Sequence, residues 1–195
     1  MATSDHYHHG NLRAALLRAA GKRLEKHGLS ALSVRAAARR AGVSHNAPYR
    51  HFPDRESLRA ALAAAGFAML GETLQEAGAA GGLRGRGEAY VRFALSHPQR
   101  FRLMFGGEPQ LAEHAVLREV ATRVFEGLSG AFTAQIPGQA GRDASIAAWS
   151  LVHGLALLML DEKIAGTARQ GRDAEDFVRS ILSSIRFAAG PVQSA

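Results

Sequence analysis

The stretch from Ser33 to Phe52 constrains the fold of this chain more than any other. Ser33 suits the N-cap of a helix over Val34–Ala41, and Gly42 follows where that helix must end with a positive φ. The alanines of this helix leave room for a second helix to cross closely. Ser44 can cap the second helix, which closes at Phe52. Together these parts predict a helix-turn-helix.

The outward face of this stretch is basic. It has no Asp or Glu, and it carries the side chains Arg35, Arg39, Arg40, His45, Asn46, Arg50 and His51. Any helical hairpin needs a glycine and small residues, but a merely solvated face would mix charges of both signs. The charge therefore favours a DNA-binding function.

The distribution of charge along the chain points the same way. Residues 1–62 hold eleven Lys and Arg against four Asp and Glu, whereas residues 63–195 hold thirteen of each. The formal charge of +7 therefore lies entirely in the first third, which fits binding to a phosphate backbone. A basic helix on a membrane surface is the alternative, but it needs large apolar side chains opposite the charges, and here that face is alanine.

The run AGVSHNAPYRHFPDRESL resembles the N-terminal domain of TetR-type transcriptional regulators. The matching residues are Gly42, Val43, Ser44, Tyr49, His51, Phe52, Arg55, Glu56 and Leu58. The match extends back through Gly28 to Leu12. Pro48 departs from the family, which usually has a branched apolar residue there. Because proline loses little in the first turn of a helix, we still expect a recognition helix over Ser44–Phe52.

This helix is expected to enter the major groove of DNA, with His45, Asn46 and Arg50 nearest to base edges. The resemblance implies that the phosphate contacts are made by Ser33, Tyr49, His51 and Arg55. The histidine-rich start, with His6, His8 and His9, resembles the N-terminal arm of one TetR branch. We expect it to be a flexible arm that contacts DNA rather than a metal site.

The remaining helices predict an all-α protein, because no sustained strand pattern is present. The expected division is a helix-turn-helix domain over residues 1–54 and a helical effector-binding and dimerisation domain over residues 55–195. The expected elements are helices Leu12–His27, Arg55–Ala77, Arg100–Phe105, Gln110–Ala134, Ala144–Glu162 and Ala174–Ala188, with a glycine-rich loop over Gly78–Gly87.

Two C-terminal helices are expected to form a dimer interface. The helix Ala144–Glu162 is apolar on nearly every side, so a domain this small needs a second chain to cover it. The helix Ala174–Ala188 carries a single apolar stripe. The expected interface residues are Leu151, Leu155, Leu158, Phe177, Ile181 and Ile185. The run WSLVHG resembles the Trp-x-x-x-His-Gly pattern of one TetR branch, and RLMFG fits the same branch.

An effector pocket is a further expectation, since the resemblance is to ligand-responsive repressors. Its candidate lining is Phe101, Met104, Phe105, Phe125, Trp149 and His153, although a plain helical core predicts the same residues. Catalysis is not expected, because Ser150 and His153 on one apolar helix do not supply a nucleophile, base and oxyanion hole in convergent geometry.

Several classes of protein are excluded or disfavoured. The chain has no cysteine, so it has no disulfide and no thiolate ligand. We expect no secretory signal, because the residues before the first expected helix are polar and histidine-rich, and the longest apolar run, Ile146–Leu160, is short for a membrane span. We expect a cytoplasmic homodimer that binds operator DNA, without a membrane, metal or cofactor. It would be a repressor released by a small apolar effector; the alternatives are a constitutive or architectural DNA-binding dimer and a membrane-associated helical protein.

Overall fold

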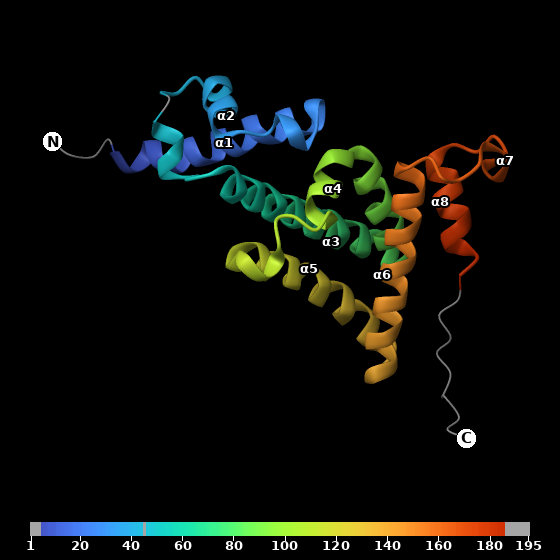
Figure 1. The fold of residues 1–195 in the computed structure, drawn as a ribbon. Helices are drawn as coiled ribbons and strands as arrows, with labels where there is room; N and C mark the ends of the chain where they lie inside the picture. The colour runs from blue at the N-terminus through green and yellow to red at the C-terminus, as the bar shows by residue number, and fades with distance from the viewer. Residues whose placement is uncertain (1–4, 45, 186–195) are drawn as a thin grey trace. The chain divides into compact units, whose positions relative to one another are not determined.

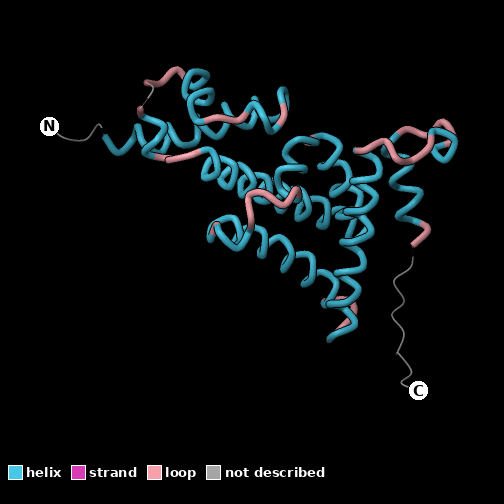
Figure 2. Tube along the Cα trace, in the orientation of Figure 1, coloured by secondary structure: helices cyan, strands magenta, loops and turns pink. Residues whose placement is uncertain are grey.

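The computed structural model of the chain describes residues 5–44 and 46–185, with side chains from Leu12 onward. Within these residues the chain is helix and loop, without a strand (Figure 2), which confirms the all-α prediction. The elements in chain order are α1 (Asp5–His27), η1 (Leu29–Ala31), α2 (Val34–Ala41), η2 (Ala47–Arg50), α3 (Arg55–Ser96), α4 (Pro98–Phe105), η3 (Leu111–Glu113), α5 (Ala115–Thr133), α6 (Gln139–Leu160), α7 (Gly166–Arg169) and α8 (Ala174–Ser183) (Figure 1).

The helices divide into two compact units that interleave along the chain. The first unit is residues 1–68 and 97–121, and the second is residues 69–96 and 122–195. The boundary expected after residue 54 falls inside the first unit, and α3 contributes residues to both units.

The first unit is built on the apolar face of α1. Leu16, Ala20 and Leu24 are almost fully buried, and α2 packs against this helix with its alanines. At the far end of α1, Glu25 caps α4: its carboxylate accepts the backbone N–H groups of Gln99 and Arg100, each at 3.3 Å. An acidic group at a helix N-terminus is stabilising because it satisfies N–H groups without an intrahelical partner.

The start of the chain differs from the prediction. A helix was expected to begin at Leu12, with a flexible arm before it, but α1 begins at Asp5 and continues through Asn11. Adding residues to an existing helix gains one hydrogen bond for each residue fixed, and no proline interrupts this segment. The three histidines of the expected arm lie within α1, and their side chains are outside the described part of the chain.

The predicted glycine-rich loop is also wrong. α3 runs through residues 78–87 and is non-helical at Gly82, where φ is 62° and ψ is −147°. The intrinsic cost of glycine in a helix is about 1 kcal/mol a residue, so packing of the flanking turns can override it. Gly87 shows such packing, because a Cβ there would lie 3.1 Å from Leu182 and 3.4 Å from Val152.

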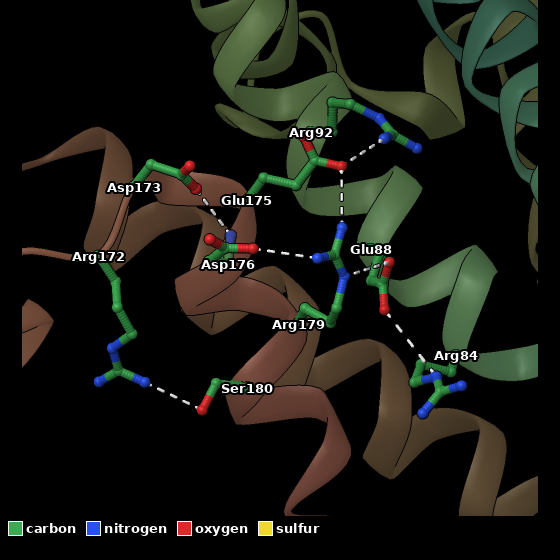
Figure 3. A network of polar contacts seen from close by, with 9 residues as sticks. All are labelled: Arg84, Glu88, Arg92, Arg172, Asp173, Glu175, Asp176, Arg179 and Ser180. Carbon is green, nitrogen blue, oxygen red and sulfur yellow. Dashed lines mark hydrogen bonds and ion pairs between the residues drawn. The ribbon is translucent and has the colours of Figure 1, made fainter.

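In the second unit, ionic contacts join α8 to α3 (Figure 3). Arg92 lies 3.5 Å from Glu175, and Arg179 lies 4.0 Å from Glu88 and 3.0 Å from Asp176. Apart from Glu88, these side chains are more than half exposed, so each pair contributes at most about 1 kcal/mol. Burial of Phe177 and Val178 contributes the larger stabilising term, since both are 4% exposed.

Several helix bounds differ from those expected. α4 begins at Pro98, α5 begins at Ala115 after the short η3, and α8 ends at Ser183 rather than Ala188. The predicted helix Ala144–Glu162 is α6, which begins five residues earlier.

The 22 residues of α6 make it long and apolar enough to cross a membrane by length and composition, unlike the shorter run Ile146–Leu160. A single such helix is weak evidence of a membrane span, since core helices of soluble proteins pass the same test; in the single chain 28% of the apolar window of α6 is buried.

Candidate functional site

The helix-turn-helix is set by two local devices around α2. The Ser33 hydroxyl oxygen accepts the backbone N–H of Ala36 at 3.1 Å, which caps the helix as predicted. At the other end Gly42 has φ 71° and ψ 27°, and the N–H of Val43 donates to the Ala38 carbonyl. Glycine adopts this left-handed conformation at little steric cost. The chain therefore turns sharply after Ala41, the residue at which the sequence predicts the end of the helix.

The surface of this turn is cationic. Arg35, Arg39 and Arg40 on α2 are exposed, and so is Arg50 at the end of η2. No acidic residue occurs between Glu25 and Asp54 in the sequence, so this stretch supplies no opposite charge of its own. A surface of this kind attracts the phosphate backbone of a nucleic acid.

The predicted recognition helix is only partly present. In place of an α-helix over Ser44–Phe52, the structure has the four-residue 3₁₀ helix η2, preceded by Asn46. Of the three predicted base readers, Asn46 and Arg50 are exposed at the two ends of this element, and His45 lies outside the described residues. The physical reason is Pro48. In an α-helix capped by Ser44, the backbone N–H of residue 48 would donate the first intrahelical hydrogen bond, and proline has no N–H.

The predicted phosphate-binding residues lie around the same turn. Ser33 caps α2, as described above. The Tyr49 hydroxyl oxygen accepts the Nε–H of Arg35 at 3.2 Å, and His51 follows η2 with its ring partly buried. Arg55 donates through Nη2 to the carbonyl oxygens of Leu29 and Ser30, at 2.9 and 3.2 Å. Arg55 thus ties the start of α3 to η1.

A second cluster of polar and aromatic side chains lies in the second unit. The Tyr90 hydroxyl accepts a hydrogen bond from Trp149 Nε1 at 3.2 Å and lies 2.9 Å from His153 Nδ1. The Phe125 ring centroid is 5.7 Å from that of Trp149. Burial raises the pKa of Tyr90 and lowers the pKa of His153, so in both groups burial favours the neutral form.

Sequence reasoning found three members of this cluster and missed Tyr90. Tyr90 is 4% exposed, and a buried tyrosine hydroxyl usually has a hydrogen-bond partner. The tyrosine in the sequence therefore indicates that its hydroxyl has a hydrogen-bond partner. It does not identify Trp149 or His153 as that partner, because both lie about 60 residues away in the sequence.

The other predicted effector residues form a separate aromatic group in the first unit. Phe101 and Met104 of α4 are buried, and the Phe105 ring lies 4.8 Å from Phe101 and 5.2 Å from Phe67 between centroids. The predicted lining thus forms two groups, each with its own ring contacts, in two units.

Comparison with known families decides the class of protein. A family model described as "Tetracyclin repressor-like, C-terminal domain" matches residues 83–185, just over half of the chain, and one described as "Bacterial regulatory proteins, tetR family" matches residues 16–62. The chain belongs to the TetR family. It is therefore a DNA-binding transcriptional regulator and not an enzyme.

Solved structures agree with the TetR assignment. A protein of unknown function from Rhodococcus sp. RHA1 is 33% identical, with 93% of this chain and 96% of that chain covered at a TM-score of 0.74. A bacterial regulatory protein in the tetR family from Rhodococcus RHA1 is 18% identical, with coverage of 93% and 95% and a TM-score of 0.60. The multidrug binding protein EbrR, complexed with imidazole, is 19% identical, with coverage of 93% and 96% and a TM-score of 0.58. No curated protein matches the chain significantly.

The TetR chain leaves apolar side chains uncovered on α6, on α8 and at Ile185, two residues after the end of α8. Leu158 is 48% exposed, and Leu151, Ile181 and Ile185 are partly exposed. The other two predicted interface residues differ, because Leu155 and Phe177 are 8% and 4% exposed within the single chain and so belong to its own core.

One group of potential metal ligands occurs among the described residues of this TetR protein. Glu56, Glu113 and His114 place their ligand atoms within 4.8 Å of one another, and His114 Nε2 lies 3.2 Å from Glu56 Oε1. Both glutamates are exposed, and a hydrogen-bonded surface pair accounts for this geometry.

Proposed function

We propose that this TetR-family chain is a homodimeric, cytoplasmic repressor that binds an operator sequence and is released by a small apolar effector. The observation that carries the DNA-binding part is the cationic turn. Arg35, Arg39, Arg40 and Arg50 are exposed on a helix-turn-helix whose own sequence contains no acidic residue.

Dimerisation is proposed from the uncovered side chains of α6, of α8 and of Ile185 just after α8. Leu151, Leu158, Ile181 and Ile185 are apolar and wholly or partly exposed in the single chain, and a two-fold axis would let each helix cover its counterpart. A dimer also presents two helix-turn-helix elements, which can then contact two half-sites spaced by about 34 Å or a multiple of it.

Effector binding is proposed from the cluster of Tyr90, Trp149 and His153. It combines aromatic surface with hydrogen-bonding groups, which suits an apolar molecule with one polar group. EbrR, which shares the fold, is a multidrug binding protein that has been solved with imidazole and with proflavin. The features Trp149, His153 and Gly154 also motivate placing this chain in the Trp-x-x-x-His-Gly branch.

The test of repression and release uses DNA that flanks the gene for this chain, because regulators of this kind commonly control their neighbours. Purified protein should protect one site there, and a library of apolar small molecules should include a compound that lowers the affinity. A ligand can shift the equilibrium only if it prefers one dimer arrangement. We expect Trp149→Ala and His153→Ala to keep operator binding and to blunt the response. Protection without any response across the library would favour a constitutive regulator instead.

A further inference from the structure

The shape of η2 determines which side chains of the reader segment can face DNA together. The N–H of Tyr49 donates to the Asn46 carbonyl at 3.3 Å, and the N–H of His51 donates to the Pro48 carbonyl at 2.9 Å. Both bonds join residues three apart, which is the 3₁₀ pattern, and a bond between residues four apart, from the N–H of Phe52 to the Pro48 carbonyl at 2.9 Å, occurs only where the segment ends. The segment from Asn46 to Arg50 is therefore wound more tightly than an α-helix.

Pro48 keeps the segment in this form. Its side chain is fully buried, so the packing of the first unit anchors it. It has no N–H to give to a carbonyl four residues earlier, so it cannot make an α-type bond. The 3₁₀ turn follows from the sequence and from packing.

The winding separates the two predicted base readers. With three residues per turn, residues three apart share a face and residues four apart lie about 120° from each other. Asn46 therefore shares a face with Tyr49, and Arg50 points about a third of a turn away. In an α-helix, Asn46 and Arg50 would lie only about 40° apart and could read one groove together.

The face of Tyr49 already includes a cation. Arg35 on α2 donates its Nε–H to the Tyr49 oxygen at 3.2 Å, so the hydroxyl hydrogen of Tyr49 can point outward as a donor. The Nη groups of Arg35 can donate to the same acceptor. A guanidinium, a phenol and the amide of Asn46 are donor types that bind phosphate oxygens.

We infer that Arg50 is the base-reading residue of the described reader segment, whereas Asn46 joins Arg35 and Tyr49 in a composite phosphate contact. This assignment rests on the proposed DNA-binding function and replaces the expectation that Asn46 reads a base. Arg35 acts as a positioning residue for Tyr49 and as a phosphate ligand itself.

The test measures the affinity of variants for three kinds of DNA. The wild-type protein first selects its operator from a random library. Dissociation constants are then measured for Asn46→Ala and Arg50→Ala on the operator, on all its single-base-pair variants and on unrelated DNA. We expect Arg50→Ala to weaken operator binding about 5- to 150-fold and to remove the preference at one base pair of each half-site. Asn46→Ala should weaken binding to all sequences by a similar factor.

A double-mutant cycle tests the composite contact. Arg35→Gln and Tyr49→Phe should together weaken binding less than the product of their separate effects, because each change disables part of one contact. Arg40→Gln is the matched control. Arg40→Gln removes the same charge from the same helix, at a position about 140° around the helix axis from Arg35. Its factor of weakened binding should therefore simply multiply with that of Tyr49→Phe. Both Arg→Gln changes should reduce the slope of log affinity against log salt by about 1.

Two outcomes would overturn the inference. One is that Asn46→Ala relaxes the preference at a base pair, which would mean that the segment rewinds to an α-helix on DNA. The other is a multiplicative Arg35/Tyr49 cycle. If the wild-type protein selected no sequence at all, the proposed function itself would fail, and this result is seen before any variant is made.

Discussion

Tyr90→Phe should destabilise the second unit by an amount that the structure allows us to estimate. The change keeps the buried ring but removes the hydroxyl that accepts from Trp149 and is hydrogen-bonded to His153. Each hydrogen bond contributes about 0.5–1.5 kcal/mol, so the free energy of unfolding should fall by about 1–3 kcal/mol. For a chain of this size, each kcal/mol lowers the melting temperature by about 2–4 °C.

Urea unfolding measures this change well, because Trp149 is the one tryptophan of the chain and its fluorescence reports on the second unit. Variants must be compared at one protein concentration, since a dimer's stability depends on it. Tyr49→Phe is the matched control. It removes an exposed hydrogen bond to Arg35 and should change the free energy of unfolding by at most about 0.5 kcal/mol. Equal effects of the two changes would show that the Tyr90 hydroxyl does not hold the cluster together.

Three further predictions follow from the fold. Burial lowers the pKa of His153 in the folded protein, so the stability that its neutral side chain contributes is fully present above about pH 6.5 and is lost as the pH falls through the folded pKa. The free energy of unfolding of His153→Gln should therefore decline less steeply with falling pH than that of the wild type. Gly82→Ala should lower the free energy of unfolding by about 1–3 kcal/mol, because φ is positive at Gly82. Gly81→Ala should instead raise it by up to about 1 kcal/mol, because Gly81 lies in the adjacent helical turn with open space around it. Thermal unfolding measures both changes, and effects of the same sign would contradict the kink at Gly82. Ile181→Asp places a carboxylate in the proposed interface, so it should give monomers in light scattering and weaken operator binding. Ile146→Asp tests how far along α6 the interface extends, because Ile146 is an exposed residue of that helix. If the Ile181→Asp protein remained dimeric, the interface would lie elsewhere.

Local signals made α2 predictable to the residue. Ser33 and Gly42 act through bonds to backbone groups within a few residues, so their effect can be read from the sequence alone. The same logic failed at Pro48, because its position was counted as the first turn of a helix. Whether a proline is tolerated depends on which N–H it replaces, and a shift of the helix start by two residues changes that.

Other features depended on partners that are distant in the sequence. The glycines of residues 78–87 predict a loop from their intrinsic propensity, but α3 continues because flanking turns pack, as the contact of Gly87 with Leu182 shows. The bond from Tyr90 to His153 joins residues 63 apart, and the ring of Phe177 is covered within its own chain. The apolar stripe on α8 was predicted correctly as a stripe. Which of its residues the chain itself buries could not be predicted without the arrangement of α3, α6 and α8.

The most direct test of the central claim is a comparison of DNA sequences at physiological salt. Protein at known concentration is titrated against its selected operator and against a scrambled duplex of the same length and composition. The account predicts at least about a 1000-fold preference for the operator, and protection of two half-sites whose centres lie about one helical turn, or a multiple of it, apart. Equal affinity for the two duplexes would contradict it.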